Sequence, residues 1–260
     1  MGLNEIIILV VSGILVGFIN TLSGGGSVIT LSLLLILGLP ANIANGTNRI
    51  SIFFQTLSSV TSFSKQKMFT SLRPLWLGIP ATIGSVLGAL TAVDVSERTI
   101  EIAMAVAMVI MVFFLFYKPD KWLKENPDML SKPLRWWQLL IFFCVGFYGG
   151  FIQVGIGYFL LMSLVLGVGY DLVKANAVKN LIVFLYAIFA LLVFVIDGQV
   201  NYLYGLILSA GSIIGALIAS YLAVKKGAGF IRAVILVSVI LTILQVSGLV
   251  DFSAIIHDLL

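Results

Sequence analysis

The sequence predicts an all-α integral membrane protein made of two inverted repeats of about five hydrophobic segments each, with glycine-broken half-helices or re-entrant hairpins. Three observations support this fold class. Hydrophobic residues make up 60% and charged residues only 10% of the 260 positions, and the mean hydropathy is +1.16, which excludes a soluble globular domain. The chain matches itself at a nearly constant offset. Glycines interrupt both copies at matching places, a pattern typical of transporters.

The internal repeat has two parts. Residues 24–53 match residues 155–184 at an offset of 131, and residues 78–92 match residues 205–219 at an offset of 127. Chance identity in such apolar sequence would be roughly one position in ten, so we interpret the matches as a duplication. The identical pairs include Gly24/Gly155, Gly26/Gly157, Gly38/Gly169, Asn45/Asn176, Phe53/Phe184, Gly84/Gly211 and Gly88/Gly215. The last two pairs have small-residue spacing, which predicts close helix packing that holds the halves together.

Apolar runs between polar breaks define ten segments. The first half contains segments near 4–22, 27–39, 43–63, 74–93 and 99–117. The second half contains segments near 136–152, 157–169, 176–196, 201–223 and 230–250. The second segment of each half is short: its helix would rise about 20 Å, less than the roughly 30 Å hydrocarbon core. We therefore expect half-helices or arms of re-entrant hairpins at these two places.

Basic residues predict the orientation of the chain. They concentrate in three loops, whose members are Lys65, Lys67 and Arg73, then Lys118, Lys121, Lys124, Lys132 and Arg135, and finally Lys225, Lys226 and Arg232. The loops at 94–98 and 197–201 are poor in positive charge. The positive-inside rule then places both termini outside and makes the two halves antiparallel. The predicted organisation is a first repeat at 1–118, a cytoplasmic linker at 119–134 and an inverted second repeat at 135–260.

Composition argues against several classes of function. The basic residues lie in short loops, not on one polar face, so no nucleic-acid partner is expected. One cysteine, Cys144, and one histidine, His257, lie far apart and cannot form the usual zinc or Cys-His sites. We predict no catalytic residues, no metal, no cofactor and no enzymatic activity.

The two glycine breaks are the first candidate binding elements. They comprise Ser23, Gly24, Gly25, Gly26 and Ser27 in the first half, and Gln153, Gly155 and Gly157 in the second half. The half-helix after each break begins with unpaired N–H groups and a positive dipole end, which favour an anion. The alternative is close helix packing through glycine. Duplication of both breaks before a short segment favours a binding function.

Two polar turns are the second candidate elements. Asn45, Thr47, Asn48 and Arg49 in the first turn correspond to Asn176, Lys179 and Asn180 in the second turn, with Asn48 opposite Lys179. An intramembrane cation is costly and indicates a binding site. The alternative is snorkelling of these side chains to lipid headgroups. Near these turns Arg49, Lys174 and Lys179 outnumber one acid, Asp171, which could pair with Lys174. This balance predicts an anionic substrate.

At these residues the chain resembles the TauE/SafE-like sulfite exporter family. The resemblance rests on Gly17 with the break at 23–26, on residues 37–40 leading to 44–48, and on residues 169–175. Asn48 stands where the family pattern usually has serine, and residues 177–179 depart from its small hydroxyl residues. The resemblance implies movement of small sulfur-containing anions such as sulfite, thiosulfate or organosulfonates.

The sequence therefore predicts a secondary transporter, more specifically an exporter, in the plasma membrane. Its partners would be the lipid bilayer and a small sulfur anion, and rocking of one repeat against the other would alternate exposure of the site. An anion channel and a non-transporting membrane scaffold or assembly partner are the alternatives. The sequence makes no prediction about oligomeric state.

Overall fold

The computed structural model describes residues 2–96, 98–99, 102, 106 and 125–246, with the side chains of 241–246 left undescribed. Its regular structure is helical throughout these ranges. The first half contains α1 (Leu3–Leu22), α2 (Ser27–Ile36), α3 (Ala41–Lys65) and α4 (Arg73–Asp94). These helices match the first four predicted segments. The fifth predicted segment, 99–117, lies almost entirely outside the described residues.

The second half repeats this order. It contains α7 (Trp136–Phe151), α8 (Ile156–Met162) continued by the π-helix η2 (Ser163–Val168), α9 (Leu172–Ile196) and α10 (Tyr202–Val246). A break at Gly227 divides α10 into two parts, as the separate predicted segments 201–223 and 230–250 require. The linker forms a short helix that the sequence analysis did not predict, α6 (Pro127–Ser131), in which Asn126 caps the N-terminus.

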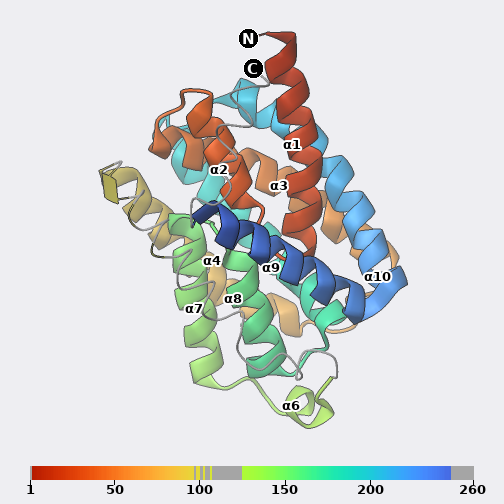
Figure 1. Ribbon diagram of the computed structural model, residues 1–260. Coiled ribbons are helices and arrows are strands. Elements are labelled where there is room, and N and C mark those ends of the chain that lie inside the picture. The colour runs from red at the N-terminus through yellow and green to blue at the C-terminus, as the bar shows by residue number, and fades with distance from the viewer. Residues whose placement is uncertain (1, 97, 100–101, 103–105, 107–124, 247–260) are drawn as a thin grey trace.

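The two glycine breaks produce a pair of hairpins. The α1–α2 hairpin enters from the end of the molecule that carries the N-terminus, and the α7–α8 hairpin enters from the opposite end (Figure 1). Their tips meet at Gly24 and Gly157, where a Cβ built on Gly24 would lie 2.2 Å from the Cα of Gly157. Gly24 also has a φ of +87°, which favours glycine. The predicted inverted arrangement and the hairpins are therefore both present.

The central helices display the internal symmetry directly. Helices α3 and α9 each contain 25 residues and begin at Ala41 and Leu172, which are 131 positions apart. The two helices pack against each other. Phe53 and Phe184, an identical pair in the sequence repeat, stack with ring centroids 5.8 Å apart. The pseudo-two-fold axis therefore passes between equivalent residues of α3 and α9.

The most extensive helix packing crosses the boundary between repeats. Helix α1 packs along α10, and α4 packs along α7. Glycines allow both contacts: a Cβ on Gly17 would lie 2.2 Å from the carbonyl oxygen of Ser212, and one on Gly84 would lie 2.1 Å from that of Phe143. The prediction that the small-residue faces join the halves is confirmed. Each long contact pairs a helix of one repeat with a helix of the other.

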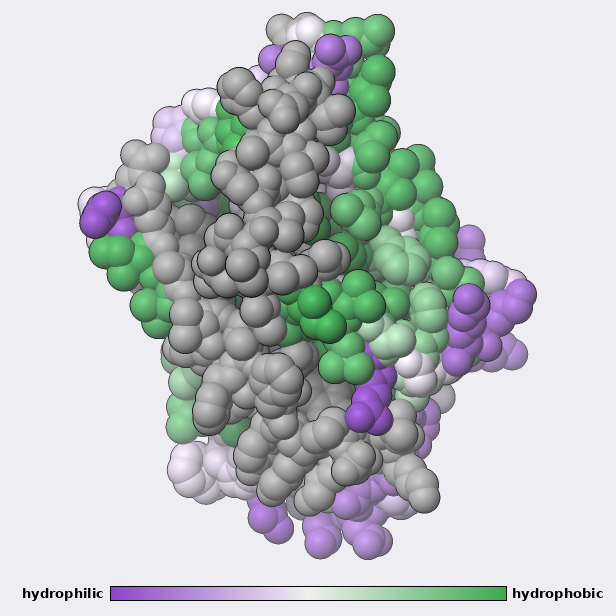
Figure 2. Space-filling model, viewed as in Figure 1, coloured by the Kyte–Doolittle hydropathy of each residue, from purple (hydrophilic) through white to green (hydrophobic). Residues whose placement is uncertain are grey.

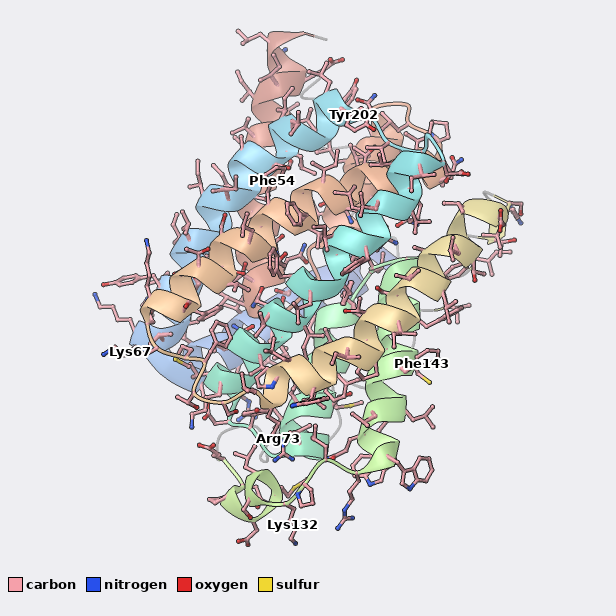
Figure 3. All side chains as sticks on the ribbon, turned by 180° about the vertical axis from the view of Figure 1, so that it is seen from behind. Phe54, Lys67, Arg73, Lys132, Phe143 and Tyr202 are labelled. Carbon is pink, nitrogen blue, oxygen red and sulfur yellow. The ribbon has the colours of Figure 1, made fainter. Side chains whose placement is uncertain are left out.

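The surface fits a membrane protein. Helices α1, α4 and α9 and the stretch Tyr202–Ile240 of α10 are long and apolar enough to span a membrane. Hydrophobic residues cover the flank formed by α1 and α10, and hydrophilic residues gather at the lower end (Figure 2). Lys67, Arg73 and Lys132 lie at one end and Tyr202 at the other (Figure 3). Helix α3 carries many polar residues, and these face the protein interior.

Candidate functional site

Lys179 on α9 binds the end of the broken helix α1. Its ammonium nitrogen donates to the carbonyl oxygens of Asn20, at 2.9 Å, and Thr21, at 2.8 Å. The amide of Asn180 donates to the same Thr21 oxygen at 3.1 Å. The last carbonyls of a helix lack intrahelical partners and carry partial negative charge, so a cation stabilises them. A side chain of the second repeat thus caps a helix of the first repeat.

Arg49 on α3 caps the C-terminal end of α7, so a side chain of the first repeat also caps a helix of the second repeat. Its guanidinium donates to the carbonyl oxygens of Gly149, at 3.2 Å, and Gly150. The amide of Asn45 donates to the carbonyl oxygen of Phe151 at 2.9 Å, and the ring of Phe194 lies 4.4 Å from the guanidinium carbon. Both cations are almost completely buried, with exposed fractions of 1% for Arg49 and 2% for Lys179. The snorkelling alternative is therefore wrong for both.

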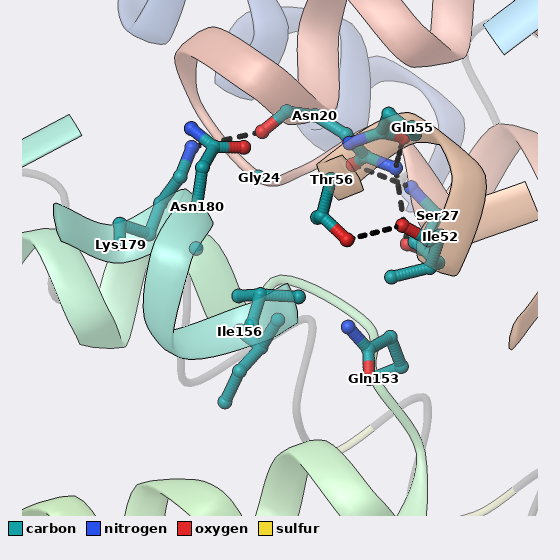
Figure 4. Close-up of a pocket in the computed structure, with 12 residues that line it drawn as sticks. Asn20, Gly24, Ser27, Ile52, Gln55, Thr56, Gln153, Ile156, Lys179 and Asn180 are labelled. Carbon is teal, nitrogen blue, oxygen red and sulfur yellow. Dashed lines mark hydrogen bonds between the residues drawn. The ribbon is translucent and has the colours of Figure 1, made fainter. Parts of the chain in front are cut away.

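A cavity lies between the two hairpin tips, beside Lys179. Its free volume is about 20 Å³, enough for one water-sized group. Both breaks contribute to its wall, as do α1, α3 and α9. The lining residues are Asn20, Gly24, Ser27, Ile52, Gln55, Thr56, Gln153, Ile156, Gly157, Lys179, Asn180 and Val183. Lys179 and Asn180 lie on one side of it, with Asn20, Gln55 and Ser27 opposite (Figure 4).

The structure brings six of the predicted site residues to this cavity: Gly24, Ser27, Gln153, Gly157, Lys179 and Asn180. The other predicted residues do not line it. Ser23 donates to the carbonyl oxygen of Ile19, and Thr47 accepts from the backbone N–H of Asn201 at the start of α10. Gly25 and Gly26 pack against Tyr158 and Asn20, and Gly155 begins α8 with a φ of +66°.

Asn48 and Asn176 complete the predicted set. Both are fully buried. Neither side-chain polar atom of Asn48 has a hydrogen-bond partner within the described part of the chain. Asn176 accepts a long bond, 3.5 Å, from Asn180.

Three polar residues of the cavity wall were not among the predicted site residues: Asn20, Gln55 and Thr56. They lie inside predicted apolar segments. A carboxamide in the middle of a span was the available signal, because an unpaired polar group there is costly.

The predicted charge balance needs one correction. Asp171 does not pair with Lys174; it caps α9 by accepting from the backbone N–H groups of Val173 and Lys174. The Lys174 ammonium lies 2.7 Å from a carboxylate oxygen of Glu125, and both side chains are about one-third exposed. Lys174 is therefore a surface residue. Arg49 and Lys179 remain, and no Asp or Glu is buried among the described residues, so the interior is still positively charged.

Comparison with known proteins identifies the family. The family model described as "Sulfite exporter TauE/SafE" matches residues 9–246. The chain belongs to this family. TauE/SafE membership agrees with the resemblance seen in the sequence, which is thereby confirmed.

Curated relatives carry the same broad description. A "Probable membrane transporter protein" of Haemophilus influenzae is 28% identical, over 91% of this chain and 92% of the relative. The "Probable membrane transporter protein YfcA" of Escherichia coli K12 is 30% identical, over 86% of this chain and 82% of the relative. No solved structure matches the chain. This TauE/SafE protein is therefore a multi-pass membrane transporter.

Proposed function

We propose that this protein is a secondary transporter, and specifically an exporter, of small sulfur-containing oxyanions such as sulfite, thiosulfate or organosulfonates. The observation that supports this most strongly is the buried ammonium of Lys179 at a polar cavity between the two hairpin tips. The family description adds sulfite as the first substrate to test.

The charge of the cavity favours an anion over a cation. Lys179 is the cation that lines it, and its lining residues include no carboxylate. Two of the three ammonium N–H groups go to helix-end carbonyls, which leaves one for a ligand. Because the surroundings are dry, an incoming oxyanion would interact with this charge far more strongly than it would in water. A metal cation or an ammonium compound would be repelled at the same position.

We propose that transport occurs by alternating access. The two groups of helices that move against each other are not the two sequence repeats. The helix contacts group α1, α2 and α3 with α10, and α4 with α7, α8 and α9. Each group contains one helix borrowed from the other repeat. Rocking of whole repeats would pull α1 from α10 and α4 from α7, which are the most tightly packed pairs. Rocking about the α3–α9 contact would preserve both pairs and expose the cavity to either side.

The proposed orientation follows from the basic end of the molecule. Lys67, Arg73 and Lys132 gather at one end, which we place in the cytoplasm by the positive-inside rule (Figure 3). The N-terminus would then lie outside. In the plasma membrane the potential, negative inside, favours outward movement of an anion by about 2.3 kcal/mol per charge at 100 mV. This direction agrees with export.

The test is anion flux in proteoliposomes. Wild type, Lys179→Gln and Lys179→Arg are compared for uptake of sulfite, thiosulfate and sulfate, with Lys132→Gln as a control that removes an exposed lysine. We expect saturable flux with counterflow in wild type and in Lys132→Gln, and its loss in Lys179→Gln. Thermal unfolding in detergent confirms that each variant is folded. Flux without saturation or counterflow would support a channel, and folded wild type without any flux would overturn the proposal in favour of a scaffold.

A further inference from the structure

Several residues that line the cavity differ in size and polarity from their equivalents in the other half of the molecule. The offset of 131 pairs each lining residue with an equivalent across the pseudo-two-fold axis. Asn20 corresponds to Phe151, Ser27 to Tyr158, Gln55 to Tyr186 and Lys179 to Asn48. Three polar residues of the cavity wall, Asn20, Ser27 and Gln55, thus have large aromatic equivalents.

These aromatic residues occupy the equivalent space. Tyr186 is fully buried, and Tyr158 is 6% exposed. The Tyr158 hydroxyl lies so close to Gly25 that a Cβ there would be 2.5 Å from it. Gly25 is the equivalent of Ile156, which lines the cavity. The two halves have diverged, and the polar cavity lies on the side of the axis formed by α1, α3 and Lys179.

A chain of hydrogen bonds orients Gln55 within this cavity. The backbone N–H of Ser27 donates to Oδ1 of Asn20 at 3.2 Å. A backbone N–H can only donate, so this bond fixes which end of the Asn20 amide is the oxygen. Nδ2 of Asn20 is therefore a donor, and it donates to Oε1 of Gln55 at 3.4 Å. Gln55 must in turn present its Nε2 group away from Asn20.

The amide nitrogen of Gln55 is a second donor that this arrangement leaves unused, beside the third N–H of Lys179. Gln55 is 2% exposed and lines the cavity, and its Nε2 makes no hydrogen bond within the described part of the chain. Two other polar residues of the wall donate to backbone carbonyl oxygens. Thr56 donates to the carbonyl oxygen of Ile52 at 2.7 Å, and Asn180 donates to the carbonyl oxygens of Thr21 and Asn176. A donor that lines a cavity and has no protein partner is free to bind a ligand or water.

We propose that the protein binds one oxyanion per chain, off the pseudo-two-fold axis, and that Gln55 is a specificity-determining donor that binds an anion oxygen opposite Lys179. This inference rests on the proposed function. Lys179 supplies the charge from the second repeat, and Gln55 supplies a directed neutral donor from the first repeat. The ligand class is a small anion with at least two oxygens separated widely enough to meet both groups. Binding requires the hairpin tips to move apart, because the free volume of about 20 Å³ in this conformation holds one water-sized group.

The experiment measures sulfite and thiosulfate transport by wild type, Gln55→Leu and Gln55→Glu in proteoliposomes. Leucine removes the amide. Glutamate keeps the shape and the acceptor for Asn20 but replaces the free donor with a carboxylate oxygen. The matched control is Gln66→Leu, which removes the same amide from the C-terminal end of the same helix, outside the cavity. Sulfite-dependent thermal stabilisation of each purified variant reports binding separately from turnover.

We expect Gln55→Leu to raise KM about tenfold or more, because it removes a hydrogen bond to a charged ligand. Gln55→Glu should raise KM further, because it also adds negative charge. A role in packing alone predicts the reverse order, with the isosteric glutamate closer to wild type, and that order would overturn the inference. Unchanged KM in both variants, with normal wild-type flux, would overturn it and leave the transporter proposal standing. Absence of flux and of stabilisation in wild type would overturn both.

Discussion

The ammonium nitrogen of Lys179 lies 2.9 Å from the carbonyl oxygen of Asn20, so a cation of the second repeat caps the broken helix of the first. The same nitrogen lines the cavity. One side chain therefore holds the end of α1 and offers charge to a ligand. In the proposed transporter, an anion that draws Lys179 toward itself would weaken the cap and would couple occupancy of the site to the position of the first hairpin.

Removing the Lys179 cap should destabilise the protein. Lys179→Met leaves the carbonyl oxygen of Asn20 without its side-chain donor, at a cost of about 1–3 kcal/mol, while the carbonyl oxygen of Thr21 keeps its bond from Asn180. Lys179→Arg retains charge and donors and should lose less. Thermal unfolding in detergent, followed by circular dichroism, measures the difference. Equal melting temperatures for the methionine variant and wild type would show that the cap contributes nothing to stability.

Arg49 should tolerate lysine poorly. Its planar guanidinium reaches the carbonyl oxygens of Gly149, Gly150 and Phe151 from one position, and an ammonium cannot reproduce this fork. We expect Arg49→Lys to lower unfolding stability by about 1–3 kcal/mol. The matched control is Arg135→Lys, at the start of α7 on the surface. If both variants unfold at the same temperature, the close fit of Arg49 to the end of α7 contributes nothing to stability.

The contact between hairpin tips should be intolerant of a single methyl group. A Cβ on Gly24 would lie 2.2 Å from the Cα of Gly157, so Gly24→Ala should prevent the tips from meeting and reduce the yield of folded protein. Gly38→Ala is the matched control, because Gly38 also has positive φ, +83°, with nothing within 4 Å of its Cβ position. The control should lose only the stability that strain at a positive φ costs, about 1–2 kcal/mol. Similar size-exclusion profiles and melting temperatures for both variants would contradict the contact.

Cross-links should distinguish the proposed moving units. In a background lacking Cys144, Ser51→Cys with Ser212→Cys joins α3 to α10 inside one unit, where the two hydroxyl oxygens lie 3.0 Å apart. Phe53→Cys with Phe184→Cys, joined by a short thiol cross-linker, ties α3 to α9 between units. We expect flux to survive the first cross-link and to be lost, reversibly, with the second. Loss of flux with the first cross-link, which joins the two repeats, would favour rocking of whole repeats.

Much of the fold could be predicted because it depends on local pattern. Long apolar runs predict spans, and glycines with a polar residue on each side, as at Ser23 to Ser27, predict a break. The helix ends observed for α1, α2, α7 and α9 lie within a few residues of those expected. The site was predicted in part: Lys179 was found because a cation in an apolar run is conspicuous. Gln55 was not predicted because an uncharged polar residue in an apolar segment is a weaker signal of a binding site than a charged one.

The sequence by itself determined the membrane class, the duplication, the two breaks and the positive interior. These properties follow from composition, spacing and charge, which do not require contacts to be known. Only the tertiary structure decided which helices pack together, that Lys174 belongs to the surface, and that the cavity lies on one side of the axis. Those properties depend on which side chains fill the same space. Tyr186 and Gln55 are equivalent in register, but the larger Tyr186 packs in the hydrophobic core while Gln55 lines the cavity.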